Sequence, residues 1–103
     1  MVNRTLENLM DQVFNTRDDI DNAIDENTLY DYLIEYEDIE FIFDGARAFL
    51  GAIVTVSSGG PNIYLDTRNG RIEGFWSSDS FYLPLDRDVK NELNNILEEF
   101  YGI

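Results

Sequence analysis

Eleven carboxylates lie between residues 18 and 44 of this 103-residue chain, and the same stretch contains no lysine or arginine. They are Asp18, Asp19, Asp21, Asp25, Glu26, Asp31, Glu35, Glu37, Asp38, Glu40 and Asp44. A carboxylate accepts bidentate hydrogen bonds from arginine, as a phosphate does. A one-sided negative field also attracts cationic surfaces and repels nucleic acid and anionic membranes. This stretch therefore predicts a partner that is a basic protein, with no direct binding of nucleic acid or membrane.

The acidic charge is concentrated in the first half of the chain. Residues 1–45 hold 13 acidic and 2 basic residues, whereas residues 46–103 hold 8 and 5, within a total net charge of −14. Protein surfaces usually mix both signs, because repulsion within a single-sign field destabilises the compact state. The concentration therefore favours a role in binding over the alternative, an acidic face that only keeps the protein in solution.

The residues needed for common catalytic and metal chemistry are missing. The chain has no cysteine and no histidine, which removes thiolate nucleophiles and the commonest general base. Asp19 and Asp21 resemble the start of a calcium loop, but its sixth position is Ile24 instead of glycine and its twelfth is Tyr30 instead of glutamate. We expect no cofactor and no dedicated metal site, and the function predicted is non-enzymatic. A small enzyme that uses paired carboxylates is an open alternative.

Aromatic residues extend the set of predicted partner contacts. Tyr30, Tyr32 and Tyr36 lie inside the acidic stretch, where an exposed tyrosine can stack on arginines of a partner. Helical spacing places Tyr32 and Tyr36 on an inward face, so Tyr30 is the better exposed candidate. An exposed Trp76 beside Tyr82 would form a second contact patch. The predicted partner-binding residues are the eleven carboxylates, Tyr30 and Trp76.

Helical periodicity predicts the elements that position the carboxylates. One amphipathic helix is expected near the N-terminus. A Thr-x-x-Asp pattern at Thr16 predicts that a second helix begins there, and Thr28 repeats the pattern for a third, separate or continuous with the second through a kink. The outer stripe of the third helix would carry Asp31, Glu35 and Asp38. The inward positions of the first two helices are Leu6, Leu9, Met10, Val13 and Phe14, followed by Ile20, Ala23 and Ile24.

The pattern changes to alternation from Ile39 onward. Strands are predicted over 39–44, 49–57, 62–67 and 71–76, with a short fifth edge strand over 81–83. Asp86 is the predicted N-cap of a last helix that ends near Gly102, with an apolar stripe of Val89, Leu93, Ile96, Leu97 and Phe100. The sequence thus predicts an α+β fold in a single domain, 1–103. N-terminal helices precede a four- to five-stranded antiparallel meander, and a C-terminal helix packs on one face of the sheet.

The chain shows no signal for export or membrane insertion. Residues 1–16 lack a basic region followed by a continuous apolar stretch, and the longest apolar stretch, 48–56, is too short to span a bilayer. The expected location is the cytoplasm of a host bacterial cell.

The small size, strong acidity, α+β pattern and missing catalytic set resemble those of small acidic anti-defence proteins of phages and mobile elements. These include anti-CRISPR and anti-restriction proteins, some of which mimic DNA. The segment Gly59-Gly60-Pro61-Asn62-Ile63-Tyr64-Leu65-Asp66-Thr67, with Gly74-Phe75-Trp76 after it, is also similar to a stretch in small proteins of such elements. The resemblance implies an inhibitor that blocks the nucleic-acid-binding groove of a CRISPR effector or a restriction enzyme, as a monomer or homodimer.

Two further interpretations stay open at this point. An immunity protein that neutralises a cationic nuclease toxin would use the same charge for the same physical reason. In a structural or regulatory phage protein, the charge would be incidental to the function.

Overall fold

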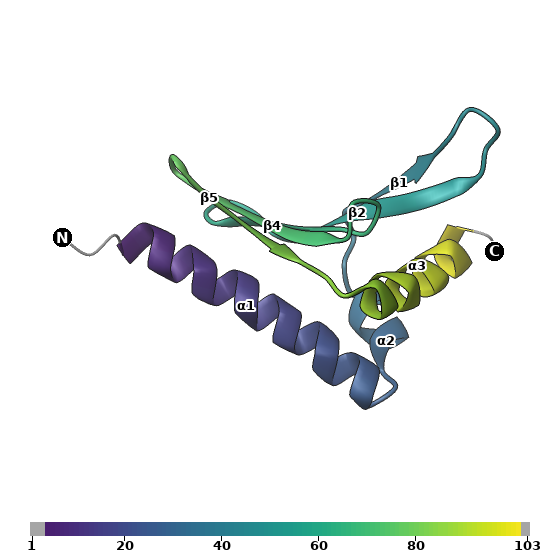
Figure 1. The fold of residues 1–103 in the computed structure, drawn as a ribbon, viewed down its shortest axis with the longest axis horizontal. Helices are drawn as coiled ribbons and strands as arrows, with labels where there is room; N and C mark the ends of the chain where they lie inside the picture. Colours follow the sequence, from purple (N-terminus) through teal and green to yellow (C-terminus); the bar gives the residue numbers. More distant parts are fainter. Residues whose placement is uncertain (1–3, 102–103) are drawn as a thin grey trace.

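Helices lie on one side of a five-stranded antiparallel sheet in the computed structural model, which describes residues 4–101 (Figure 1). The strands form a meander, so their order in the sheet is their order in the sequence. This arrangement confirms the predicted α+β fold. The elements are α1 (Arg4–Asp25), α2 (Leu29–Ile34), β1 (Ile39–Phe43), β2 (Phe49–Ser57), β3 (Asn62–Asp66), β4 (Arg71–Trp76), β5 (Asp79–Pro84) and α3 (Arg87–Tyr101).

Helix α1 is one continuous helix of 22 residues, so the prediction of a new helix at Thr16 is wrong. Thr16 is buried inside α1, and its hydroxyl donates a hydrogen bond to the carbonyl of Gln12 at 2.9 Å instead of capping a helix start. The physical reason is that the apolar stripe passes through this point in phase. The buried positions of α1 follow each other at alternating spacings of four and three: Leu9, Val13, Thr16, Ile20 and Ala23.

Helix α2 is short, and this changes the position of one predicted carboxylate. Thr28 precedes the helix but makes no side-chain capping hydrogen bond; its hydroxyl lies 3.5 Å from the carbonyl of Ala23 at the end of α1. Because α2 ends at Ile34, Asp38 lies in the segment that leads to β1. The prediction that Asp38 lies on the outer stripe of this helix is therefore wrong.

The helices cover one face of the sheet. Helix α1 packs on β4 and β5, and α3 packs on β2, as Figure 1 shows. Strand residues alternate between this covered face and the opposite one; in β4, Ile72 and Gly74 are buried whereas Arg71, Glu73 and Phe75 are half-buried. The apolar core consists of Leu9, Val13, Ile20, Ala23, Leu29, Leu33, Ala52, Val54, Ile63, Leu65, Ile72, Leu93 and Leu97.

Helix α3 is tied to the sheet by hydrogen bonds as well as by apolar contacts. The hydroxyl of Thr67, which is fully buried, donates to Oδ1 of Asn94 at 2.6 Å and accepts from the backbone N–H of Ala52 at 2.9 Å. The side-chain amide of Asn94 donates to the carbonyl of Thr67 at 3.1 Å. The predicted stripe of α3 is confirmed, with Leu93 and Leu97 buried, while its predicted end at Gly102 lies outside the described residues.

Candidate partner-binding surface

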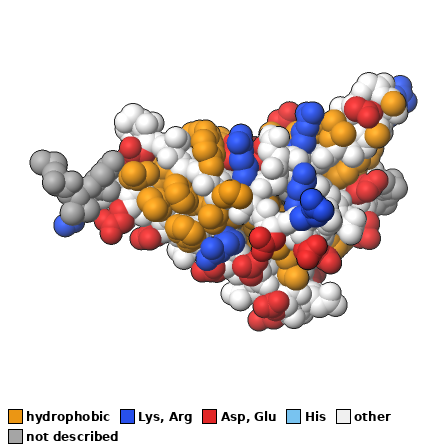
Figure 2. Space-filling model, viewed as in Figure 1, with side chains coloured by type: hydrophobic (Ala, Val, Ile, Leu, Met, Phe, Trp, Pro, Cys, Tyr) orange, Lys and Arg blue, Asp and Glu red, His pale blue; other side chains and the backbone are white. Residues whose placement is uncertain are grey.

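The eleven carboxylates of residues 18–44, here called the acidic surface, are all exposed. Among the described residues, two ion pairs are formed: Arg17 with Asp18 at 3.1 Å, and Arg71 with Glu73 at 2.6 Å. Asp18 is therefore the one member of the acidic surface that has a basic partner within residues 4–101. In Figure 2, acidic side chains gather at the bottom of the view, over the end of α1 and over α2, whereas Lys and Arg side chains lie mainly nearer the sheet.

Helix α1 arranges carboxylates in a row along its outer side. Asp11, Asp18 and Asp25 follow each other at intervals of seven residues, which is about 10.5 Å along the axis with a drift of only ~20° around it. Glu7 lies four residues before Asp11 and continues the row. All four side chains are exposed. Sequence reasoning centred on residues 18–44 missed Glu7 and Asp11, although their heptad spacing relative to Asp18 was a visible signal.

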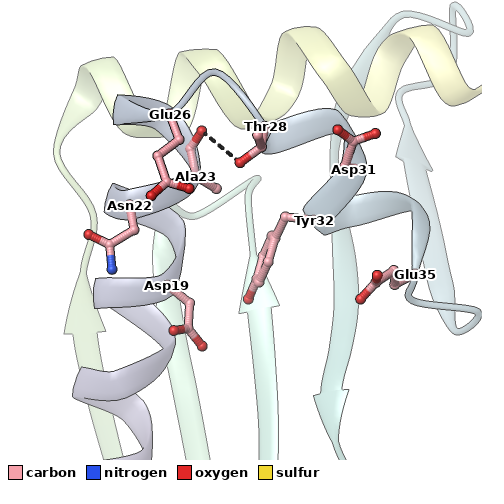
Figure 3. Close-up of a pocket in the computed structure, with 8 residues that line it drawn as sticks. All are labelled: Asp19, Asn22, Ala23, Glu26, Thr28, Asp31, Tyr32 and Glu35. Atoms are coloured by element: carbon pink, nitrogen blue, oxygen red, sulfur yellow. Dashed lines mark hydrogen bonds between the residues drawn. The ribbon is translucent and has the colours of Figure 1, made fainter.

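A groove of about 330 Å³ lies between the end of α1 and α2 (Figure 3). In Figure 3 the ring of Tyr32 stands between the two helices. Asp19 lies on α1 and Glu26 directly after its end, while Asp31 lies on α2 and Glu35 directly after its end. No three or more carboxylates of the described residues converge closely enough to hold a metal ion. The groove thus presents separated negative charges around an aromatic ring. Its lining residues are Asp19, Asn22, Ala23, Glu26, Thr28, Asp31, Tyr32 and Glu35.

Tyr32 supplies the neutral part of this groove. Burial raises the pKa of the Tyr32 phenol well above its usual range, and the neighbouring Tyr36 adds to the effect. The Tyr36 hydroxyl donates to the Tyr32 hydroxyl at 3.2 Å, and the two rings contact each other edge to face at 5.4 Å. Tyr32 therefore stays protonated among carboxylates, and both tyrosines pack toward the core as the helical spacing indicated.

The structure separates two of the predicted carboxylates from the rest. Glu40 lies on β1, and Asp44 lies in the β1–β2 turn, at a distance from the α1–α2 junction (Figure 1). Oδ1 of Asp44 accepts hydrogen bonds from the backbone N–H groups of Ala46 at 2.8 Å and Ala48 at 2.9 Å. Asp44 therefore closes a turn, whereas the nine carboxylates from Asp18 to Asp38 lie on α1, on α2 and in the segments that flank α2.

The two predicted aromatic contacts lie in different surroundings. The Tyr30 side chain is 42% exposed, and its ring packs edge to face on Phe100 of α3 at 5.0 Å. Trp76 lies on the helix-covered face of the sheet and packs against the core. Phe75, not Trp76, is the residue beside Tyr82, with ring centroids 5.9 Å apart. Trp76 and Tyr82 therefore do not form the second contact patch that was expected.

No family model, curated protein or solved structure matches this chain. No helix within residues 4–101 has both the length and the apolar character needed to cross a membrane. The assignment of a function therefore rests on the charges and contacts of this chain.

Proposed function

We propose that this protein is a non-enzymatic inhibitor that binds the nucleic-acid-binding groove of a bacterial defence protein, either a CRISPR effector or a restriction enzyme. The observation that carries the proposal is the acidic surface itself, eleven exposed carboxylates of which one has a basic partner among the described residues. Unpaired carboxylates keep their capacity to bind arginine and lysine of another protein.

The row of carboxylates on α1 gives the acidic surface a defined length and direction. From Glu7 to Asp25 it extends over 18 residues, which is roughly 27 Å at ~1.5 Å per residue. Proteins that bind DNA neutralise its phosphates with patches of Lys and Arg along the duplex, where one negative charge occurs per ~1.7 Å of axis. A rigid helix with a row of carboxylates competes for such a patch. Its charge density is lower than that of DNA, and it offers no base edges for sequence recognition.

The groove beside Tyr32 adds an aromatic contact to the charge interactions. A guanidinium group that enters the groove meets carboxylates from both α1 and α2 and the half-buried Tyr32 ring. Arginine stacks on aromatic rings and pairs with carboxylates at the same time. The half-exposed Tyr30 lies on α2 as well and offers a further aromatic contact.

The test reverses the charge of four carboxylates and measures inhibition. The variant combines Asp21→Lys, Asp25→Lys, Asp31→Lys and Glu35→Lys, at exposed positions of α1 and at α2. Loss of inhibition of CRISPR or restriction nuclease cleavage, with an unchanged circular dichroism spectrum, is expected. The matched control makes the same change in charge at four exposed acids of α3 and should inhibit normally: Asp88→Lys, Glu92→Lys, Glu98→Lys and Glu99→Lys.

The partner is identified by a pull-down from a bacterial lysate with this protein as bait. A nucleic-acid enzyme that elutes as the salt concentration rises, and that added DNA displaces, supports the proposal. A nuclease toxin recovered in the same way would reassign the protein to the immunity role. Full inhibition by the variant with lysines at α1 and α2 would contradict the mimicry mechanism.

A further inference from the structure

The turn between β3 and β4, residues 67–70, contains the one asparagine of the chain that is followed by glycine, Asn69-Gly70. In such a pair the asparagine side chain reacts readily with the following backbone nitrogen, because glycine has no side chain to hinder ring closure. Asn69 is exposed to water, whereas Gly70 is buried and has a φ of 72°, the left-handed conformation that glycine favours. The turn therefore holds a reactive sequence in one defined conformation.

The reaction open to this pair is deamidation. The backbone nitrogen of Gly70 forms a bond to Cγ of Asn69, and the bond from Cγ to Nδ2 breaks. The proton of the Gly70 N–H leaves with the side-chain amide group as ammonia. Water then opens the resulting succinimide ring at one of its two carbonyl groups, which leaves aspartate or isoaspartate at position 69. The reaction needs no oxidant or reductant.

In the folded turn, Asp66 holds both reacting groups. The Gly70 N–H donates to the carbonyl of Asp66 at 2.9 Å, so the proton that must leave the nucleophile is already bound. Nδ2 of Asn69, the leaving group, donates to Oδ2 of Asp66 at 2.8 Å. Oδ1 of Asp66 accepts from the backbone N–H groups of Arg68 at 3.1 Å and Asn69 at 3.0 Å. Ring closure requires the Asn69 side chain to rotate into a near-attack geometry, which breaks these contacts.

We propose that Asn69-Gly70 is a deamidation site that the folded turn protects through Asp66, and that the modification occurs when this turn opens. Asp66 is only 5% exposed, so water does not readily replace it as the partner of the Asn69 amide. Segments of a protein open locally with free energies that range up to that of global unfolding. The rate of deamidation therefore measures how often the turn opens. This inference does not rest on the proposed function.

The turn is connected to helix α3, so the modification has consequences beyond position 69. The N–H of Leu85, which precedes α3, donates to the carbonyl of Gly70 at 2.8 Å. The hydroxyl of Thr67 donates to Oδ1 of Asn94 on α3 at 2.6 Å. An aspartate at position 69 places a second carboxylate against Asp66, and an isoaspartate lengthens the main chain of the turn by one methylene group. Both products therefore loosen the attachment of α3 to the sheet.

Peptide mass spectrometry of the protein, incubated at slightly alkaline pH with and without concentrated urea, tests the protection. Deamidation replaces an NH₂ group by OH, so the peptide that contains position 69 gains mass, and the converted fraction is followed over time. Conversion should be about tenfold or more slower in the folded protein than in the unfolded chain. Equal rates in the two states would overturn the proposal, and this comparison needs no variant.

The variant Asp66→Asn tests whether Asp66 is responsible. Its side-chain oxygen can still accept from the two backbone N–H groups, but its NH₂ group cannot accept from the Asn69 amide. Conversion at Asn69 in the folded variant should be roughly five- to tenfold faster than in the wild type, the factor that corresponds to one lost hydrogen bond. In urea the two rates should be equal.

Asp86→Asn is the matched control for this substitution. It removes the same charge at an exposed residue directly before α3, and conversion at Asn69 should keep its wild-type rate. An Asp66→Asn protein that is folded by circular dichroism and converts at the wild-type rate would overturn the role of Asp66.

The effect of the modification on stability is measured with Asn69→Asp, which reproduces the aspartate product. This variant should lower the midpoint of urea denaturation. Asn95→Asp adds the same charge at an exposed residue of α3 and should lower the midpoint less. A midpoint for Asn69→Asp at or above that of the wild type would overturn the inferred loosening of α3.

Discussion

Gly74 determines how closely α1 approaches the sheet. A Cβ atom at this position of β4 would lie 2.7 Å from Cγ2 of Val13 and 2.8 Å from Cδ1 of Leu9, both on α1. Contacts this short do not occur between real side chains, so the helix or its side chains would have to move. The absence of a side chain at Gly74 thus allows α1 to pack directly over β4.

Gly74→Ala should therefore destabilise the protein by about 1–3 kcal/mol through overpacking of the core. Urea denaturation monitored by circular dichroism measures this loss. Gly45→Ala is the matched control, because a Cβ atom there would meet nothing within 4 Å and the residue is exposed. Equal stability of the two variants would show that the α1–β4 contact has room for a methyl group.

Single-residue predictions from the sequence succeeded where charge decided the outcome. Charged side chains are rarely buried without partners, so the exposure of all eleven carboxylates was the expected outcome. The buried carboxylate of Asp66 accepts hydrogen bonds from Arg68 and Asn69 instead. The orientation of Phe75 and Trp76 did not follow, because two adjacent aromatic residues fit either face of a strand equally well. Their orientation is set by register, which places Gly74 and Trp76 toward α1. The hydrogen bond from the N–H of Ala46 to Asp44 is an Asx turn, a local preference of Asp that the sequence analysis did not use.

The charges at the C-terminal end of α1 are unfavourable for the helix. The helix macrodipole favours acidic residues in the first turn and basic residues in the last. Glu7 follows this rule, but α1 has no basic residue in its last turn and ends at Asp25. Asp21 also lies four residues before Asp25, a spacing at which like charges repel. The end of α1 is therefore less stable than its length suggests.

Asp25→Asn should stabilise the protein by on the order of 0.5 kcal/mol, because it removes a negative charge from the negative end of the helix dipole. Glu7→Gln, in the first turn of the same helix, removes the same charge and should lower stability by a similar amount. The midpoint of urea denaturation at low salt measures both. A shift in the same direction for the two variants would argue against the dipole as the cause.

Element boundaries followed from the sequence where turn residues or a long helical stripe marked them. The bounds of β2 and β4 match the sequence-based expectation, because turn residues lie on both sides of each strand. The stripe of α3 matches because its helical spacing extends over the whole helix. The break predicted at Thr16 failed because a capping pattern is local, whereas the buried stripe that overrides it extends along the whole of α1. The groove between α1 and α2 depends on the angle between two helices, which the sequence does not encode locally.

The whole molecule carries a net charge of −14, and few ion pairs form among the described residues. Repulsion between the carboxylates therefore destabilises the folded state. Salt screens this repulsion. The melting temperature should therefore rise between low salt and about 0.5 M NaCl, as differential scanning calorimetry at low protein concentration would show. The variant with lysines at residues 21, 25, 31 and 35 has a net charge of −6, because each reversal adds two positive charges, and should lose most of this rise. An equal rise in both proteins would point to a general salt effect.

The position of the acidic surface on one side of the molecule also has a kinetic consequence. Most of the carboxylates lie on the helices and in the segments that flank α2. The helices lie on one side of the sheet (Figure 1), so the molecule has an electric dipole across its layers. In the field of a basic protein such a dipole turns before contact, which raises the association rate constant above the ~10⁵–10⁶ M⁻¹s⁻¹ of uncharged pairs. Salt slows this approach far more than it speeds dissociation, which depends on short-range contacts. Under the proposed function, a basic partner would therefore meet the helices of this protein first.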